Sequence, residues 1–503
     1  MNIKRAKEEI KDTIEAYLYR DETGEYAIPA IRQRPVLLIG PPGVGKTQIM
    51  EQVARACGIG LVAYTITHHT RQSAIGLPFI SEQTYGEKAV SVTQYTMSEI
   101  VAAVYNKMEE TGLKEGILFI DEINCVSETL APAMLQFLQY KTFGNHKIPD
   151  GWIIAAAGNP PEFNKSVREF DIATLDRVKQ IFVEPDFAVW KEYAVRMEVH
   201  PAILSYLTAR PQNFCQVETT VDGPVFATPR GWEDLSRFLT VYEKLGISCD
   251  REVVSQYIPH GRIARDFASY LELYYKYQAH YQIDEALSGH RSEALLEQAA
   301  RAPFDEKLSV ISLVLAKLNV EFRKTGKMED SLELLFEKLK AVKERLAEDG
   351  DRTPVQRLTA FIGEVREEYE GKKQAGLLTR AQIHQYEDVC GTMDQYLLAA
   401  GEAEAQDGEA LFGMLASRFG EEREQYEDQC RAALQMVEYA FDFMEGAFGD
   451  SQEMVIFITE LNTSYDAVRF LEENPCERYY QYNRKLLFED READIKRKLE
   501  RLL

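Results

Sequence analysis

The sequence predicts an α/β domain built on a parallel sheet, followed by a region that is almost entirely α-helical. Short apolar runs alternate with segments of helical periodicity up to about residue 186, strand patterns fade from residue 187, and beyond about residue 285 nearly all apolar spacing is helical. Strands that alternate with helices need crossover connections, which make the sheet parallel and bring ligands to the carboxyl ends of its strands. We therefore expect domains over residues 1–186, 187–285 and 286–503.

Five short apolar runs are expected to be strands of this sheet, because parallel strands covered on both faces have continuous rather than alternating apolar patterns. The runs are Pro35–Ile39, Leu61–Ile66, Ile117–Ile120, Trp152–Ala157 and Gln180–Val183. Helical spacing between them predicts helices, one ended by Gly58 and another opened by a capping box over Thr96–Glu99.

The remaining residues predict helices of ordinary globular length. Thr228 is predicted to be the N-cap of a helix, and Pro229 its first residue. Breaks at Asp349-Gly350-Asp351, Gly371, Gly401 and Gly449 are expected to separate the helices of the third domain. This pattern favours a compact helical domain over one long coiled coil.

Composition limits the class of protein. The chain has 503 residues and a net charge of −23, from 58 Lys+Arg and 81 Asp+Glu. Since nucleic-acid affinity arises mainly from clustered cations that release counterions, no nucleic acid is expected as a principal partner. The first residues are charged, and no apolar run approaches the ~18 residues of a spanning helix, so we expect a cytoplasmic chain without membrane insertion.

The segment Gly40-Pro41-Pro42-Gly43-Val44-Gly45-Lys46-Thr47 fits the pattern G-x-x-x-x-G-K-[ST] at every fixed position. It lies between an expected strand and an expected helix, the context in which this pattern binds phosphates. The glycines allow backbone N–H groups to surround phosphates, and the N-terminus of the helix adds partial positive charge. We expect Lys46 to contact the β and γ phosphates of ATP, and Thr47 to hold Mg²⁺ through its hydroxyl.

Two other expected strands end in polar residues. Asp121 and Glu122 follow the run Ile117–Ile120, and Asn159 follows the next strand. We expect Asp121 to bind Mg²⁺ and its waters, and Glu122 to orient or deprotonate the attacking water. Asn159 would position that water, with simple turn chemistry in the segment 158–161 as the alternative.

These motifs, together with Leu175-Asp176-Arg177 and Thr228-Pro229-Arg230, occur in the order found in AAA+ ATPases. The first 285 residues most resemble the MoxR branch of that family. The resemblance implies an AAA+ P-loop ATPase domain over residues 1–186 and a helical lid over residues 187–285. It also implies that Arg177 is an arginine finger offered to a neighbouring subunit, and that Arg230 is the sensor 2 arginine.

Both arginines have alternative explanations. Arg177 precedes an expected strand and is also a candidate for a surface salt bridge, and Arg168 is a nearby rival for the finger role. We favour Arg177, because a finger must project from the subunit edge with fixed geometry. Arg230 is otherwise a solvated residue of a first helical turn, although the helix dipole opposes a cation there and a phosphate would explain it.

The resemblance further implies a remodelling ATPase that assembles into a ring, and in the MoxR branch such ATPases act on partners with von Willebrand factor A domains. We therefore expect a homo-oligomer, by analogy a hexamer, that transmits ATP hydrolysis to a protein client. The alternatives are a metal-chelatase-type motor subunit, a nucleotide-dependent switch or scaffold with little hydrolysis, and a DNA motor. The acidic third domain lies outside the resemblance, and its charge suits a basic face of a client.

Overall fold

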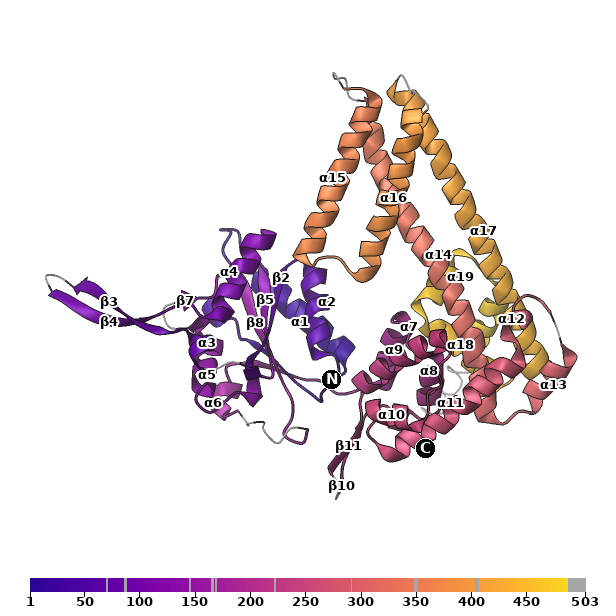
Figure 1. Cartoon of the computed structure of the whole chain (residues 1–503), viewed down its shortest axis with the longest axis horizontal. Helices are drawn as coiled ribbons and strands as arrows, with labels where there is room; N and C mark the ends of the chain where they lie inside the picture. Colours follow the sequence, from indigo (N-terminus) through magenta and orange to yellow (C-terminus); the bar gives the residue numbers. More distant parts are fainter. Residues whose placement is uncertain are drawn as a thin grey trace, which may run out of the picture. The chain divides into compact units, whose positions relative to one another are not determined.

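The computed structural model describes residues 1–68, 71–85, 88–143, 146–163, 167, 170–220, 223–290, 292–347, 352–402 and 407–486. The chain divides into two compact units. The first comprises Met1–Val189 and Glu368–Arg380, and the second comprises Trp190–Glu367 and Ala381–Leu503. The first unit contains a five-stranded sheet, and the second is largely helical (Figure 1).

The sheet of the first unit is parallel throughout, in the order β2-β5-β8-β1-β9. Its strands are β1 (Val36–Ile39), β2 (Gly60–Thr65), β5 (Gly116–Asp121), β8 (Trp152–Gly158) and β9 (Lys179–Phe182). All five correspond to the apolar runs predicted from the sequence, so the predicted parallel sheet is confirmed. Because β8 pairs with both β1 and β5, the carboxyl ends of these three strands are neighbours.

Alternate residues of the strands enter two hydrophobic cores, one on each face of the sheet. Val36 and Leu38 of β1 belong to one core, and Leu37 between them belongs to the other. The helices that contribute to the two cores are α1 (Ile3–Leu18) and α2 (Lys46–Cys57) for the first, and α4 (Glu99–Thr111) and α5 (Ala131–Tyr140) for the second. Burial on both faces explains why the strands have continuous apolar patterns.

The sequence patterns missed three antiparallel hairpins. They are β3 (Pro78–Tyr85) with β4 (Lys88–Tyr95), β6 (Thr142–Phe143) with β7 (His146–Lys147), and, in the second unit, β10 (Gln216–Thr220) with β11 (Gly223–Ala227). The β3–β4 ribbon extends away from the sheet (Figure 1), and most of its residues are exposed. A ribbon without a buried face has no strict apolar alternation, which is the signal that predicts a strand.

The predicted capping box over Thr96–Glu99 was wrong. Helix α4 begins at Glu99 with Ser98 as its N-cap, and the Ser98 side chain accepts a hydrogen bond from the Ile100 amide. The Thr96 hydroxyl instead accepts from the Leu77 amide at 2.9 Å. Thr96 therefore ties the end of the β3–β4 ribbon together rather than capping the helix. The short helices of this unit are α3 (Arg71–Ile75) and α6 (Ile172–Leu175).

The second unit contains the predicted helix start at Thr228, whose side chain accepts a hydrogen bond from the Gly231 amide at the start of α9. The helices from residue 187 onward are α7 (Phe187–Arg196), α8 (Pro201–Ala209), α9 (Pro229–Leu245), α10 (Arg251–Tyr257), α11 (Gly261–Tyr281), α12 (Ile283–Ala286), α13 (Glu293–Arg301), α14 (Phe304–Ala347), α15 (Pro354–Ala375), α16 (Arg380–Glu402), α17 (Gly408–Phe448), α18 (Gln452–Thr463) and α19 (Tyr465–Glu473). The start of α7, the end of α15 and the first residue of α16 belong to the first unit. Residues on both sides of the predicted boundary at 286 lie in this unit. That boundary stays a prediction.

The expectation of ordinary helix lengths was wrong, since α14 has 44 residues and α17 has 41. Gly371 lies inside α15 and Gly401 inside α16, whereas Gly449 does end α17. The predicted break at residues 349–351 lies outside the described residues. A glycine inside a helix costs only about 1 kcal/mol relative to alanine. The shared core of α14, α15, α16 and α17 outweighs that cost. Within the described ranges, no helix has the length and apolar character that crossing a membrane requires.

Candidate functional site

The predicted phosphate loop connects the end of β1 to the start of α2. Gly43 and Gly45 have φ values of 80° and 91°, in the left-handed region that favours glycine. A Cβ on Gly40 would lie 2.5 Å from the carbonyl oxygen of Val183, so the start of the loop packs closely against the end of β9. Gly45 is the N-cap residue of α2 and provides no side-chain cap. The loop thus presents an uncapped helix N-terminus, which suits an anion.

Lys46 links this loop to the neighbouring strand β8. Its side chain is buried, and Nζ donates hydrogen bonds to the carbonyl oxygens of Gly40 at 2.7 Å and Pro41 at 2.9 Å. The same ammonium donates to Oδ1 of Asn159 at 2.9 Å. Two residues 113 positions apart in the sequence are therefore in contact, as expected for strand ends that share one edge of a sheet.

The acidic residues at the end of β5 contact the start of α2. Oγ1 of Thr47 donates to Oδ2 of Asp121 at 2.9 Å, and the Glu122 amide donates to Oδ1 of Asp121 at 2.9 Å. Glu122 has a φ of 56°, an uncommon conformation for a residue with a side chain, and its Oε2 accepts from Thr67 at 3.1 Å. Burial, and then the charges of Glu122 and Asp121, raise the pKa of the nearby Cys125 thiol.

These residues fit a nucleotide with Mg²⁺. Magnesium binds hard oxygen ligands, and the Thr47 hydroxyl and Asp121 carboxylate are adjacent oxygens of that kind. The left-handed glycines and the Lys46 ammonium are the groups that surround phosphates in such loops. The cation and the lysine would also balance the negative charge of the phosphates and of the two carboxylates.

Sequence reasoning missed two residues that contact the predicted ones. Thr67 follows β2 and donates to Glu122, and Asn124 donates through Nδ2 to the backbone oxygen of Asn159 at 2.8 Å. Neither contact has a sequence signal of its own, because each joins segments that only the strand order brings together. In the sequence, Asn124 is visible only as the residue two positions after Glu122.

The predicted Arg177 and Arg230 belong to different units of the chain. Arg177 is exposed and lies two residues after the end of α6, and its Nη1 donates to Oε1 of Gln139 on α5 at 3.0 Å. Arg168 lies outside the described residues. Arg230 is exposed in the first turn of α9, in the second unit.

Comparison with protein families identifies the segment that carries these motifs. Residues 35–178 match the family model of the AAA domain, dynein-related subfamily. This segment is therefore similar to an AAA domain and is called the AAA domain from here on. It includes β1, the phosphate loop, Asp121, Glu122 and Asn159, and the first unit has the fold of a P-loop AAA+ domain.

No curated protein matches the chain. Among the solved structures that match is one described as "a putative ATPase", from Cytophaga hutchinsonii, with 17% identity and a TM-score of 0.23. The match covers 39% of this chain and 56% of that one.

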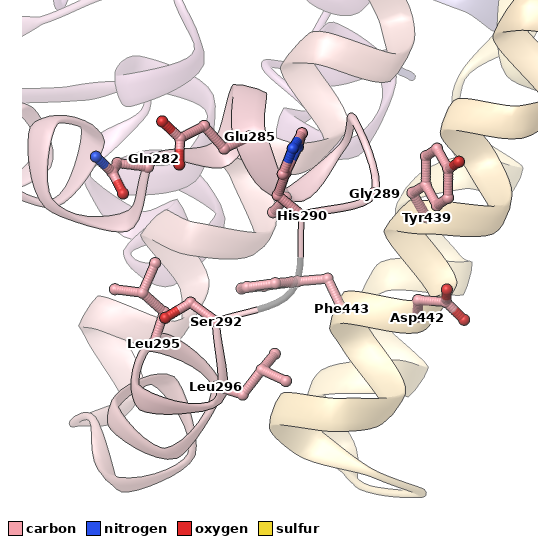
Figure 2. A pocket seen from close by; sticks show the side chains of 11 residues that line it. Gln282, Glu285, Gly289, His290, Ser292, Leu295, Leu296, Tyr439, Asp442 and Phe443 are labelled. Atoms are coloured by element: carbon pink, nitrogen blue, oxygen red, sulfur yellow. The ribbon is translucent and has the colours of Figure 1, made fainter.

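A separate cavity of about 240 Å³ lies in the second unit (Figure 2). Tyr439 and Asp442 of α17 form one side of it, and Glu285 and His290 lie on the other. Asp442 also accepts a hydrogen bond from Arg478 at 2.7 Å. None of the predicted site residues lines this cavity, so the candidate site is the edge of the sheet in the AAA domain.

Proposed function

We propose that this protein is a Mg²⁺-dependent ATPase of the AAA+ class, similar to the MoxR branch, that acts on a protein client. The observation that carries the proposal is the arrangement at the sheet edge. Lys46 contacts both the phosphate loop and Asn159, while Thr47 contacts Asp121, whose neighbour is Glu122. A phosphate-binding group, a metal-binding pair and a candidate base thus converge from three neighbouring strand ends.

In this proposal each side chain has one task. The loop Gly40–Gly45 and Lys46 bind the phosphates of ATP, and Thr47 and Asp121 hold Mg²⁺. When bound, the cation neutralises charge on the β and γ phosphates. Glu122 orients the attacking water or accepts its proton, and Asn159 positions that water.

The arginines complete the site in an assembly. Arg177 is exposed, which suits a finger offered to the next subunit of a ring, and Arg230 acts as the sensor 2 residue. By resemblance the ring is a hexamer and the client carries a von Willebrand factor A domain. A metal-chelatase-type motor subunit uses the same ATPase core.

Turnover of ATP by the purified chain, compared with a Glu122→Gln variant, tests the enzymatic part. Glutamine keeps the shape of the side chain but accepts no proton, so the variant should bind ATP with unchanged affinity and hydrolyse it at least about 100-fold more slowly. The matched control is Glu110→Gln, which changes an exposed glutamate of α4 and should retain full activity.

Two outcomes contradict this proposal in different ways. Tight ATP binding without turnover by the unaltered chain would identify a nucleotide-dependent switch or scaffold. Normal turnover by Glu122→Gln would show that another group activates the water. The same variant, loaded with ATP, is the bait for client capture, and a client without a von Willebrand factor A domain would contradict the MoxR-like partner.

A further inference from the structure

We propose that Asn124 is a positioning residue for hydrolysis, because its side-chain amide holds the carboxyl end of β8 and thereby the side chain of Asn159. The inference rests on the proposed function and adds a residue to it. Asn124 belongs to the short 3-10 helix Ile123–Cys125 that follows Glu122. Its side-chain amide donates to the backbone of Asn159, so we infer that it acts through the residue that it holds.

The contact is buried and direct. Asn124 is 5% exposed, and its Nδ2 donates to the backbone oxygen of Asn159 at 2.8 Å. A buried amide that loses its partner pays the cost of desolvation, so this hydrogen bond strongly favours one position of the strand end. The Asn159 side chain, which leaves the same residue, contacts Lys46 at 2.9 Å. Asn159 is thus held by its backbone on one side and its side chain on the other.

Gly158 provides the space that this contact needs. A Cβ at this position would lie 2.6 Å from Oδ1 of Asn124 and 2.9 Å from its Nδ2. Any residue larger than glycine at position 158 would displace the side-chain amide of Asn124 from β8. Gly158 also pairs with Ile39 of β1, and its carbonyl oxygen accepts from the Gly40 amide at 3.4 Å. The residue before Asn159 therefore joins the phosphate loop to the Asn124 side chain.

Asn124 also connects the two groups that would face the attacking water. Glu122 lies two residues before it, at the start of the 3-10 turn that the Cys125 amide closes on the Glu122 oxygen at 2.9 Å. Asn159 lies at the other end of the Asn124 hydrogen bond. A displacement of about 1 Å between reacting groups is enough to lower a rate a hundredfold. Asn124 thus fixes the separation between the candidate base and the candidate water-positioning amide.

Steady-state kinetics of Asn124→Ala and Asn124→Asp test the inference. Alanine removes the donor, and aspartate keeps the shape while placing an acceptor against the Asn159 oxygen. Both should lower kcat by about tenfold or more, with ATP affinity and KM within twofold of the unaltered chain. Asn106→Asp is the matched control, since it makes the same change at an exposed position of α4.

A double-mutant cycle separates positioning from a general loss of structure. If Asn124 acts through Asn159, adding Asn124→Asp to Asn159→Ala should lower kcat no further, because the positioned amide is already absent. Gly158→Ala should reproduce the Asn124 defect by a second route. The inference is overturned if the double variant loses as much further kcat as Asn124→Asp loses by itself, or if both Asn124 variants keep an unchanged kcat. Either result leaves the proposed function intact. Absence of turnover in the unaltered chain would overturn the proposed function, and the inference with it.

Discussion

At the scale of single residues, the candidate site depends on how the Lys46 ammonium is held. Its oxygen acceptors include the carbonyls of Gly40 and Pro41 and the side chain of Asn159. A buried ammonium keeps its charge only where such acceptors replace water. Phosphate oxygens are stronger partners for a cation than neutral carbonyl or amide oxygens. The side chain is therefore prepared for an anion in the loop.

Lys46→Ala should weaken ATP binding by at least about 100-fold, because a charge-assisted contact to phosphate is lost and water does not replace it at the same geometry. Titration of the variant with a fluorescent ATP analogue measures the affinity. Lys114→Ala, at an exposed position before β5, is the control and should bind normally. Equal affinity of the two variants would mean that ATP does not use this loop.

At the scale of elements, the turn between α5 and β6 contains a second buried lysine. Lys141 is the C-cap of α5 with a φ of 54°, is 5% exposed, and donates through Nζ to Gln33 at 2.9 Å and to the Trp152 oxygen at 3.3 Å. Burial lowers the pKa of Lys141 from 10.5 to about 8, an effect that Asp150 opposes and Lys147 reinforces. The side chain that holds this turn is therefore a lysine whose charged form is disfavoured by burial.

This depressed pKa predicts a particular pH dependence of stability. Between pH of about 8 and 10.5 the unfolded chain binds a proton on Lys141 that the folded chain has released, so the free energy of unfolding should rise with pH across this window. The gain is on the order of 3 kcal/mol. Denaturant unfolding at several pH values, with Lys141→Met as the reference, measures it.

The difference in unfolding free energy between the unaltered chain and Lys141→Met should change in that window and be constant below it. Comparison with the variant removes the contributions of tyrosines and cysteines that titrate in the same range. Lys114→Met should follow the unaltered chain at every pH. If the free energies of unfolding of Lys141→Met and of the unaltered chain changed in parallel with pH, Lys141 would have an ordinary pKa in the folded chain.

At the scale of the whole molecule, the proposed assembly depends on Arg177. Its guanidinium is exposed and its Nη1 donates to one amide oxygen, that of Gln139. If it is a finger acting between subunits, the active site is complete only in the ring, and specific activity should rise with protein concentration. Removing such a finger costs ~10³ to 10⁵ in rate.

Mixing two inactive variants tests this arrangement. Arg177→Ala should bind ATP but be nearly inactive, as should Glu122→Gln. In a mixed ring, some interfaces combine an intact Glu122 from one variant with an intact Arg177 from the other, and these should recover hydrolysis that neither protein shows alone. Co-assembly without any recovery would argue that Arg177 acts within its own subunit, and Arg168 would then be tested in the same way.

Local patterns in the sequence were enough to predict much of the AAA domain and the start of α9 in the second unit. Burial on both faces of the sheet required continuous apolar runs, so the five strands were visible as such. The phosphate loop was visible because φ values near 80° and 91° at Gly43 and Gly45 favour glycine. The cap of α9 at Thr228 was visible because its hydrogen bond to the Gly231 amide spans three residues. In each case the cause lies within a few residues of the effect.

Other features were decided only by the tertiary structure. The contacts of Lys46 with Asn159 and of Asn124 with the Asn159 backbone join residues 113 and 35 positions apart, and they exist because β8 pairs between β1 and β5. The length of α14 depends on packing against α15, α16 and α17. Strand order and helix packing minimise the exposed apolar surface of the whole unit, and that quantity has no local pattern in the chain. For this reason the sequence predicted the groups of the candidate site, whereas the distances between them came from the fold.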